Sequence, residues 1–295
     1  SGLFMEAIEQ NPVYYELAFE MPCHPDSIDL RAWLKQYVTR RYGAFSPATQ
    51  KAWMLLLEGP YRQGTNGTEK SSIVAARPAL DVKKSGPNAG LEIPYDPALI
   101  IRAQSLLLED ADKLSASRPY RFDLVDVQRQ MMTNLGQLIH RKAAEAFRSK
   151  DREAFTLHSE RFLGMLADMD TLLRTRSEYS FDRWLTEARS WGETEEEKNQ
   201  MERDATSLVT IWGADGDPRI FDYSWREWAG LINGYYLPRW QKFYTMLQQH
   251  LDEGTSYEEA GLPQIYGREA FRANDFYHAL AEWELSYVDT YGKAR

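Results

Sequence analysis

The residues of this chain that could do chemistry are mainly carboxylates. Most of them, such as residues 195–197, lie in charged runs typical of solvated helix surfaces. Glu6 differs because it lies in an apolar stretch, residues 3–8, directly before a helix that should begin at Pro12. The end of a strand and its loop deliver an acid into the pocket of an α/β barrel in this way. Glu6 is therefore the first candidate for a catalytic carboxylate, and Glu9 is its rival.

Other catalytic chemistries lack the residues they need. The sequence has no phosphate-binding glycine loop, no His-x-x-x-His or Glu-x-x-His pair and no Gly-x-Ser-x-Gly elbow. The five histidines are scattered over separate predicted elements, and the single cysteine, Cys23, excludes an internal disulfide and a site built on several thiolates. We therefore expect neither a bound metal nor a cofactor.

The elements that must position these residues are helices, and the fold class predicted is all-α. Apolar residues recur at helical spacing through most of the chain, and strand patterns are hard to find. A first helix from Pro12 should end at Pro22 and Pro25, and a second should be capped by Ser27 and closed by Gly43. The further predicted helices are Pro47–Leu57, Pro97–Leu114, Phe122–Arg148, Asp151–Arg174, Phe181–Trp191, Glu195–Trp212, Ser224–Leu251 with a kink at Pro238, and a last one that carries Phe271 to Tyr287.

Two segments interrupt the helices. Residues 59–96 contain so many glycines and prolines that they predict one extended loop, which either covers a site or is a surface insertion. Residues 212–222 predict a tight polar turn with aromatic residues at both ends.

Length and charge exclude several classes of protein. The chain has 295 residues, enough for one large domain or two small ones, and 44 acidic against 35 basic residues give a net charge of −9. This charge disfavours nucleic acid as a partner. The sequence has no apolar run of the length that spans a membrane, and we expect the chain to be a piece of a longer protein.

Several long motifs resemble one known family in the same order. The segment from Gly2 to Tyr15 resembles the part of the α-N-acetylglucosaminidases, glycoside hydrolase family 89, that carries their second catalytic glutamate. The other matching motifs lie at 30–33, 40–43, 76–80, 120–127, 129–130, 211–213, 221–223 and 229–240. Ala7 and Ala214 depart from the family pattern, where a glycine and a proline are common.

This resemblance implies that the chain is part of an enzyme with a small N-terminal domain, a (β/α)8 barrel and an all-α C-terminal domain. Residues 1–25 would be the end of a (β/α)8 catalytic barrel, and residues 26–295 an all-α C-terminal domain. The family removes terminal α-linked N-acetylglucosamine from glycans with retention, which needs two carboxyl groups roughly 5 Å apart. Glu6 matches the nucleophile, whereas the acid/base glutamate would lie in the upstream barrel domain. The chain alone should therefore be inactive, and its partners would be that barrel and the glycan.

The helical domain could contribute residues that contact the sugar. A pyranose is bound by aromatic stacking together with polar hydrogen bonds, and Trp212, Asp222 and Tyr223 offer both on one turn. Arg77 in the long loop is a further candidate, and a purely structural role for Trp212 stays open. Trp225, Trp228 and Trp240 are expected to be core residues. The alternative function is a helical carbohydrate-binding or interaction module. We expect a periplasmic or secreted location in a bacterium, or a lysosomal one in an animal.

Overall fold

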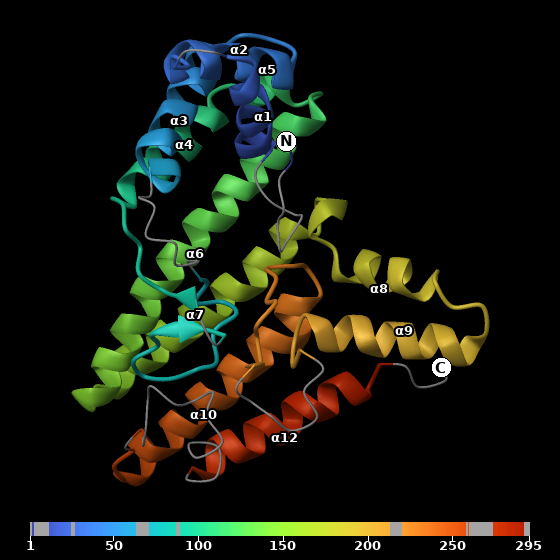
Figure 1. The fold of residues 1–295 in the computed structure, drawn as a ribbon. Coiled ribbons are helices and arrows are strands. Elements are labelled where there is room, and N and C mark those ends of the chain that lie inside the picture. Colours follow the sequence, from blue (N-terminus) through green and yellow to red (C-terminus); the bar gives the residue numbers. More distant parts are fainter. Residues whose placement is uncertain are drawn as a thin grey trace. The chain divides into compact units, whose positions relative to one another are not determined.

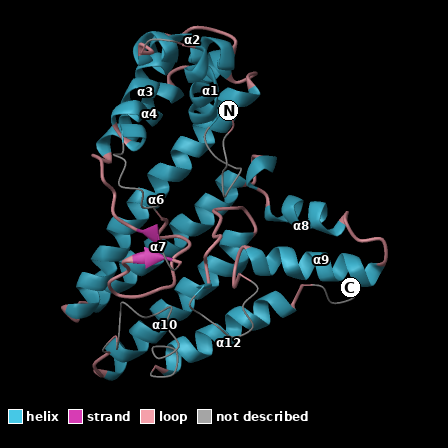
Figure 2. Cartoon of the chain, in the orientation of Figure 1, coloured by secondary structure: helices cyan, strands magenta, loops and turns pink. Residues whose placement is uncertain are grey.

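The fold is helical, as the sequence predicts (Figures 1 and 2). The computed structural model describes residues 2, 12–24, 27–62, 71–86, 89–212, 220–257, 259 and 274–291. The one sheet within these ranges is an antiparallel pair of two-residue strands, β1 (Lys84–Ser85) and β2 (Ala89–Gly90). The predicted all-α class is therefore confirmed. Residues 3–8, expected to be the end of a strand and its loop, lie outside the described residues.

The chain divides into two compact units. The first comprises Ser1–Gln63 and Tyr95–Val127, and the second comprises Gly64–Pro94 and Gln128–Arg295. The predicted division at residue 25 stays a prediction. The long helix α6 (Arg118–Arg148) begins in the first unit and continues into the second.

The first unit consists of short helices around an aromatic core. They are α1 (Pro12–Glu20), η1 (Met21–Cys23), α2 (Leu30–Tyr42), α3 (Pro47–Glu58), η2 (Pro60–Arg62), α4 (Ala98–Leu108) and α5 (Ala111–Leu114). Asp29 caps α2, because its carboxylate accepts from the backbone N–H groups of Arg31 and Ala32, so the predicted cap at Ser27 was two residues early. Gly43 ends α2 at φ +79°, as predicted.

The second unit consists of longer helices. They are the second part of α6, then α7 (Arg152–Leu173), η3 (Ser177–Tyr179), α8 (Phe181–Arg189), α9 (Glu195–Leu208), η5 (Ile232–Tyr236), α10 (Leu237–Glu253) and α12 (Asp275–Asp289). Helix α10 packs against α7 and against α12. Trp240 and Phe162 meet in the core with ring centroids 4.6 Å apart. The prediction that Trp240 and Trp228 are core residues is confirmed, and Trp225 is half-buried.

The predicted helix Ser224–Leu251 was wrong in its first turns. Residues 225–228 are not helical, and the chain then enters η5, a π-helix, directly before α10. Gly230, with φ +90°, lies two residues before η5 and allows the chain to turn into it. The Asp170 carboxylate accepts hydrogen bonds from the backbone N–H groups of Gly230 and Asn233. Pro238 occupies the first turn of α10, where its missing N–H costs little. The aromatic periodicity alone did not reveal this start.

Other helix ends differ from the predictions by smaller amounts. The expected helix Pro97–Leu114 is divided into α4 and α5, and α6 begins at Arg118 rather than Phe122. Helix α9 ends at Leu208, four residues before Trp212. Helix α12 begins at Asp275 behind an Asn274 cap, and Phe271 lies outside the described residues.

The predicted long loop is buried, and is not a surface insertion, at its centre. Residues 72–80 are all buried in the second unit. Buried loop backbone needs hydrogen-bond partners, and side chains from the helices supply them. The carbonyl of Val74 accepts from the Trp240 indole at 3.3 Å, and that of Pro78 accepts from the Tyr277 hydroxyl at 3.0 Å. The loop is therefore fixed to α10 and α12.

Candidate functional site

The structure brings four of the five predicted site residues together in the second unit. Arg77 comes from the buried loop, Trp212 lies shortly after α9, and Asp222 and Tyr223 lie in the next described turn. Glu6, the predicted nucleophile, and its rival Glu9 lie outside the described residues. The predicted site residues that the structure places are therefore the sugar-binding candidates alone.

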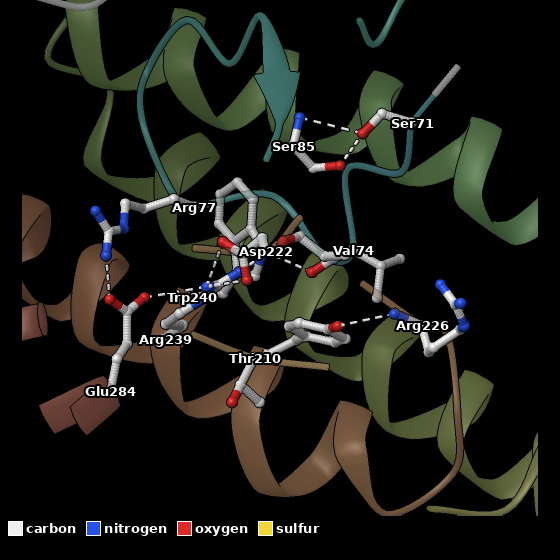
Figure 3. A network of polar contacts seen from close by, with 12 residues as sticks. Ser71, Val74, Arg77, Ser85, Thr210, Asp222, Arg226, Arg239, Trp240 and Glu284 are labelled. Atoms are coloured by element: carbon white, nitrogen blue, oxygen red, sulfur yellow. Dashed lines mark hydrogen bonds and ion pairs between the residues drawn. The ribbon is translucent and has the colours of Figure 1, made fainter. Parts of the chain in front are cut away.

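Asp222 and Arg77 belong to one buried ion network (Figure 3). The Arg239 guanidinium donates to both carboxylate oxygens of Asp222, each at 2.9 Å, and to Glu284 at 3.0 Å. Glu284 also accepts from Arg77. The side chains of all four residues are 0% exposed. Two guanidinium groups and two carboxylates thus balance each other's charge without solvent.

Burial dominates the electrostatics of this network. Loss of solvation raises the pKa of the Asp222 carboxyl above its usual value, and Arg239 opposes this shift by favouring the charged form. Glu284 raises the pKa further, since it is a second negative charge nearby. The network therefore costs solvation energy, which the ion pairs offset only in part.

The described residues 211–212 and 220–223, here called the aromatic turn, contain two left-handed residues. Trp212 has φ +57° and Asp222 has φ +61°, a region that costs a residue other than glycine about 1–2 kcal/mol. Backbone hydrogen bonds of 2.7 Å hold both: Trp212 N–H donates to Ser207, and Asp222 N–H donates to Thr210. Such strained conformations persist only where the surroundings fix them, and they concentrate at functional sites.

Trp212 and Tyr223 form an aromatic pair at the two ends of this turn. Their ring centroids are 4.7 Å apart with an interplanar angle of 45°, and both side chains are half-buried. Their neighbours Ile211 and Phe221 are fully buried in a core cluster with residues of α12 such as Tyr277. The turn is therefore anchored through its apolar residues, while the aromatic pair keeps part of its surface accessible.

The β1–β2 hairpin contacts the backbone of Asp222 through Gly86. Gly86 has φ +65°, and a Cβ atom at this position would lie 2.6 Å from the carbonyl oxygen of Asp222. Only glycine permits this close approach. The long loop thus supports the turn with its hairpin and supplies Arg77 to the network.

The π-helix η5 places two tyrosines around Arg239. The Arg239 guanidinium lies 4.8 Å from the ring centroid of Tyr235 and 5.3 Å from that of Tyr236. Both rings are fully buried. The Tyr236 hydroxyl accepts from the backbone N–H of Arg226 at 3.2 Å, which fixes the chain just after the turn.

Comparison with known proteins identifies the family. The family model of the α-N-acetylglucosaminidase (NAGLU) C-terminal domain matches residues 33–292. The chain belongs to this family. It is 32% identical to human α-N-acetylglucosaminidase over 265 residues, which are 88% of this chain and 34% of the human protein.

Solved structures agree with this assignment. A family 89 glycoside hydrolase from Clostridium perfringens in complex with PUGNAc superposes with a TM-score of 0.82 and 27% identity, over 96% of this chain and 34% of that chain. A variant of this enzyme in complex with its substrate GlcNAc-α-1,4-galactose gives a TM-score of 0.83 and 28% identity, over 97% of this chain and 32% of that one. The chain thus spans about a third of the length of these relatives.

Within this NAGLU C-terminal domain, the predicted sugar-binding residues differ in accessibility. Trp212 and Tyr223 have surface available for a ligand, whereas Asp222 and Arg77 are fully buried. The two buried residues contact other residues of the second unit: Asp222 pairs with Arg239, and Arg77 pairs with Glu284 and lies over the Phe221 ring. Their predicted role as direct ligand contacts stays a prediction.

Sequence reasoning missed two residues of the network, Arg239 and Glu284. The signal was present, because each is a charged residue between aromatic or apolar neighbours in a helix that is otherwise buried on that side. Pro238 and Trp240 flank the arginine, and Trp283 and Leu285 flank the glutamate. A charge in such a position needs a buried partner.

No group of three or more His, Cys, Asp or Glu side chains in the described ranges could hold a metal ion. Among the same residues, no helix is long and apolar enough to cross a membrane.

Proposed function

We propose that the protein containing this chain is a retaining, exo-acting glycosidase that removes terminal α-linked N-acetylglucosamine from glycans. The observation that carries the proposal is the family match over residues 33–292. The Clostridium perfringens relative in complex with GlcNAc-α-1,4-galactose supports both the sugar and the α linkage.

In this proposal, Glu6 is the nucleophile. Its carboxylate attacks the anomeric carbon, and the bond to the leaving oxygen breaks as a second carboxyl group protonates that oxygen. Water then hydrolyses the glycosyl-enzyme, with the second group acting as base. This acid/base glutamate is assigned to the barrel domain upstream of this chain. We therefore expect the 295-residue chain alone to have no hydrolytic activity.

The helical domain would supply part of the wall of the active site. The partly accessible Trp212 and Tyr223 rings would pack against the apolar face of the sugar. Asp222 and Arg77 would act through the buried network beneath them. Hydrolysis of this kind involves only protein carboxyl groups and water, so no cofactor is proposed.

The partners proposed are the glycan and the preceding barrel domain, and nucleic acid is not among them because the chain carries a net charge of −9. A retaining glycosidase of this specificity would work in the periplasm or outside the cell in a bacterium, or in the lysosome of an animal.

The test is to label the full-length protein with a mechanism-based fluorosugar and to locate the adduct by mass spectrometry. We expect the adduct on Glu6, its loss in Glu6→Gln, and its retention in the matched control Glu9→Gln. An adduct on Glu9, or near-normal turnover by Glu6→Gln, would refute the assignment of the nucleophile.

A separate titration of N-acetylglucosamine distinguishes the alternative function. Saturable binding by a full-length protein that hydrolyses no aryl α-N-acetylglucosaminide would favour a carbohydrate-binding module instead of an enzyme.

A further inference from the structure

The buried ion network lies where four segments of the second unit meet. Arg77 comes from the long loop, Asp222 from the aromatic turn, Arg239 from α10 and Glu284 from α12 (Figure 3). Apolar side chains of similar volume would stabilise such a core equally well or better, because four charges lose their solvation here. The value of the network therefore lies in the geometry that it specifies.

Asp222 connects the network to the turn. Its side chain accepts two hydrogen bonds from Arg239, and its backbone holds the left-handed conformation next to Tyr223. Arg239 also donates to the carbonyl of Ala75 at 2.6 Å, which fixes the loop that leads to Arg77. One guanidinium thus links the turn, the loop and, through Glu284, helix α12.

A second contact acts on the same backbone from another side. Gly86 of the hairpin approaches the Asp222 carbonyl so closely that any side chain at that position would displace it. The conformation of residues 222–223 is therefore fixed both by charge and by close packing. The Tyr223 ring, and Trp212 packed on it, take their orientation from this conformation.

We propose that Arg239 and Glu284 are positioning residues, which act through Asp222 to hold the Trp212–Tyr223 pair in the orientation that binds the sugar. The proposal rests on the proposed function, in which this pair contacts the substrate. Arg239 and Glu284 touch no substrate in this proposal. Their loss should weaken substrate binding and leave the rate of the chemical step unchanged.

The first unit provides a matched control of the same chemistry. Arg41 donates to both oxygens of the buried Asp123 carboxylate at 2.6 and 2.7 Å, and the Tyr42 hydroxyl donates to it at 2.8 Å. This pair joins helix α2 to helix α6, and both of its residues have ordinary backbone conformations. Its loss should lower stability without changing the aromatic turn.

The experiment uses the full-length protein and measures kcat, KM and the thermal unfolding midpoint with an aryl α-N-acetylglucosaminide. The main variant is Asp222→Asn, because asparagine tolerates the left-handed region while the charge and one of the two acceptor oxygens for Arg239 are removed. We expect KM to rise about three- to tenfold, the loss that a misplaced aromatic contact brings, with kcat within about twofold. Glu284→Gln should change KM in the same direction, and Arg239→Lys should retain part of the wild-type affinity.

Asp123→Asn is the control, with a lowered unfolding midpoint and an unchanged KM expected. Gly86→Ala is the second variant, because it removes no charge and still displaces the Asp222 carbonyl. It should raise KM even if Asp222→Asn does not fold.

A double-mutant cycle makes the test specific. If the network acts through the aromatic pair, Asp222→Asn should raise KM little further in a Trp212→Ala background. Additive effects on KM, or an effect on KM that Asp123→Asn reproduces, would overturn the proposal. An unchanged KM in Trp212→Ala would overturn it as well, while loss of the Glu6 adduct in Glu6→Gln would leave the proposed function standing.

Discussion

Replacing Arg239 with methionine should destabilise the second unit more than any surface change of the same kind. The guanidinium makes three hydrogen bonds to buried carboxylate oxygens and one to the carbonyl of Ala75. Methionine fills much of the same space but donates to none of these groups. Asp222 and Glu284 then share a buried site from which one of the two positive charges has been removed.

The magnitude follows from these contacts. Removing one partner of a buried ion pair costs about 3–5 kcal/mol, and a buried carbonyl that loses its donor costs about 1 kcal/mol or more. The added apolar contact of methionine offsets roughly 1 kcal/mol. We therefore expect a loss of about 4 kcal/mol, which for a unit of this size lowers the unfolding midpoint by roughly 8–16 °C.

The assay is urea unfolding followed by circular dichroism, with Arg183→Met as the matched control. Arg183 pairs with Glu187 at 2.7 Å, but the two side chains are 52% and 56% exposed. The control should lose less than about 1 kcal/mol. Equal losses in the two variants, with unchanged m-values, would refute the reasoning that the buried charges depend on Arg239.

Three further predictions concern single substitutions in the second unit. Gly86→Ala should cost about 2 kcal/mol more than Gly43→Ala, measured by urea unfolding, because both glycines have positive φ but only Gly86 lacks space for a Cβ atom. Thr194→Ala should cost about 1 kcal/mol, because it breaks the capping box with Glu197 at the start of α9, and a loss below about 0.3 kcal/mol would contradict this. Wild type should lose up to about 3 kcal/mol of stability between pH 6.5 and pH 4, because burial lowers the pKa of the His140 imidazole to about 4. His140→Gln should not show this loss, and parallel plots of unfolding free energy against pH for the two proteins would exclude the prediction.

The helices were predictable from sequence where their signals are local. Asn274, Asp151 and Thr194 cap their helices with side-chain oxygens, and Gly43 and Gly254 end theirs in the left-handed region. These features depend on residues within four positions of each other. The late start of η5 depends on the tertiary contacts of Asp170 and was missed, as was the division between α4 and α5.

The candidate site was only partly predictable for the same reason. Trp212, Asp222 and Tyr223 are neighbours in a recognisable turn, and they do lie together. Arg239 and Glu284 join them only because α10 and α12 pack beside that turn. Spacing along the sequence contains no information about a pair that is 45 residues apart. The prediction for Glu6 falls outside the described residues and stays a prediction.

Two buried groups of this unit respond to acid in opposite directions. His140, packed between Trp240 and Phe162, is buried in its neutral form, so the unfolded state binds its proton near pH 6.5 and stability falls as the pH decreases towards 4. Asp222 has a raised pKa, so the folded state binds its proton at a higher pH than the unfolded state does, and this group favours folding as the pH decreases through that range. The two contributions partly cancel, which keeps the stability of the unit less dependent on pH than either group alone would.

Because protonation of Asp222 removes one of the two negative charges that face Arg239, the same acidification weakens the link between α10 and the aromatic turn while the fold persists. Protonation of Asp222 should therefore alter the Trp212–Tyr223 pair without unfolding the second unit, because the same protonation favours the folded state.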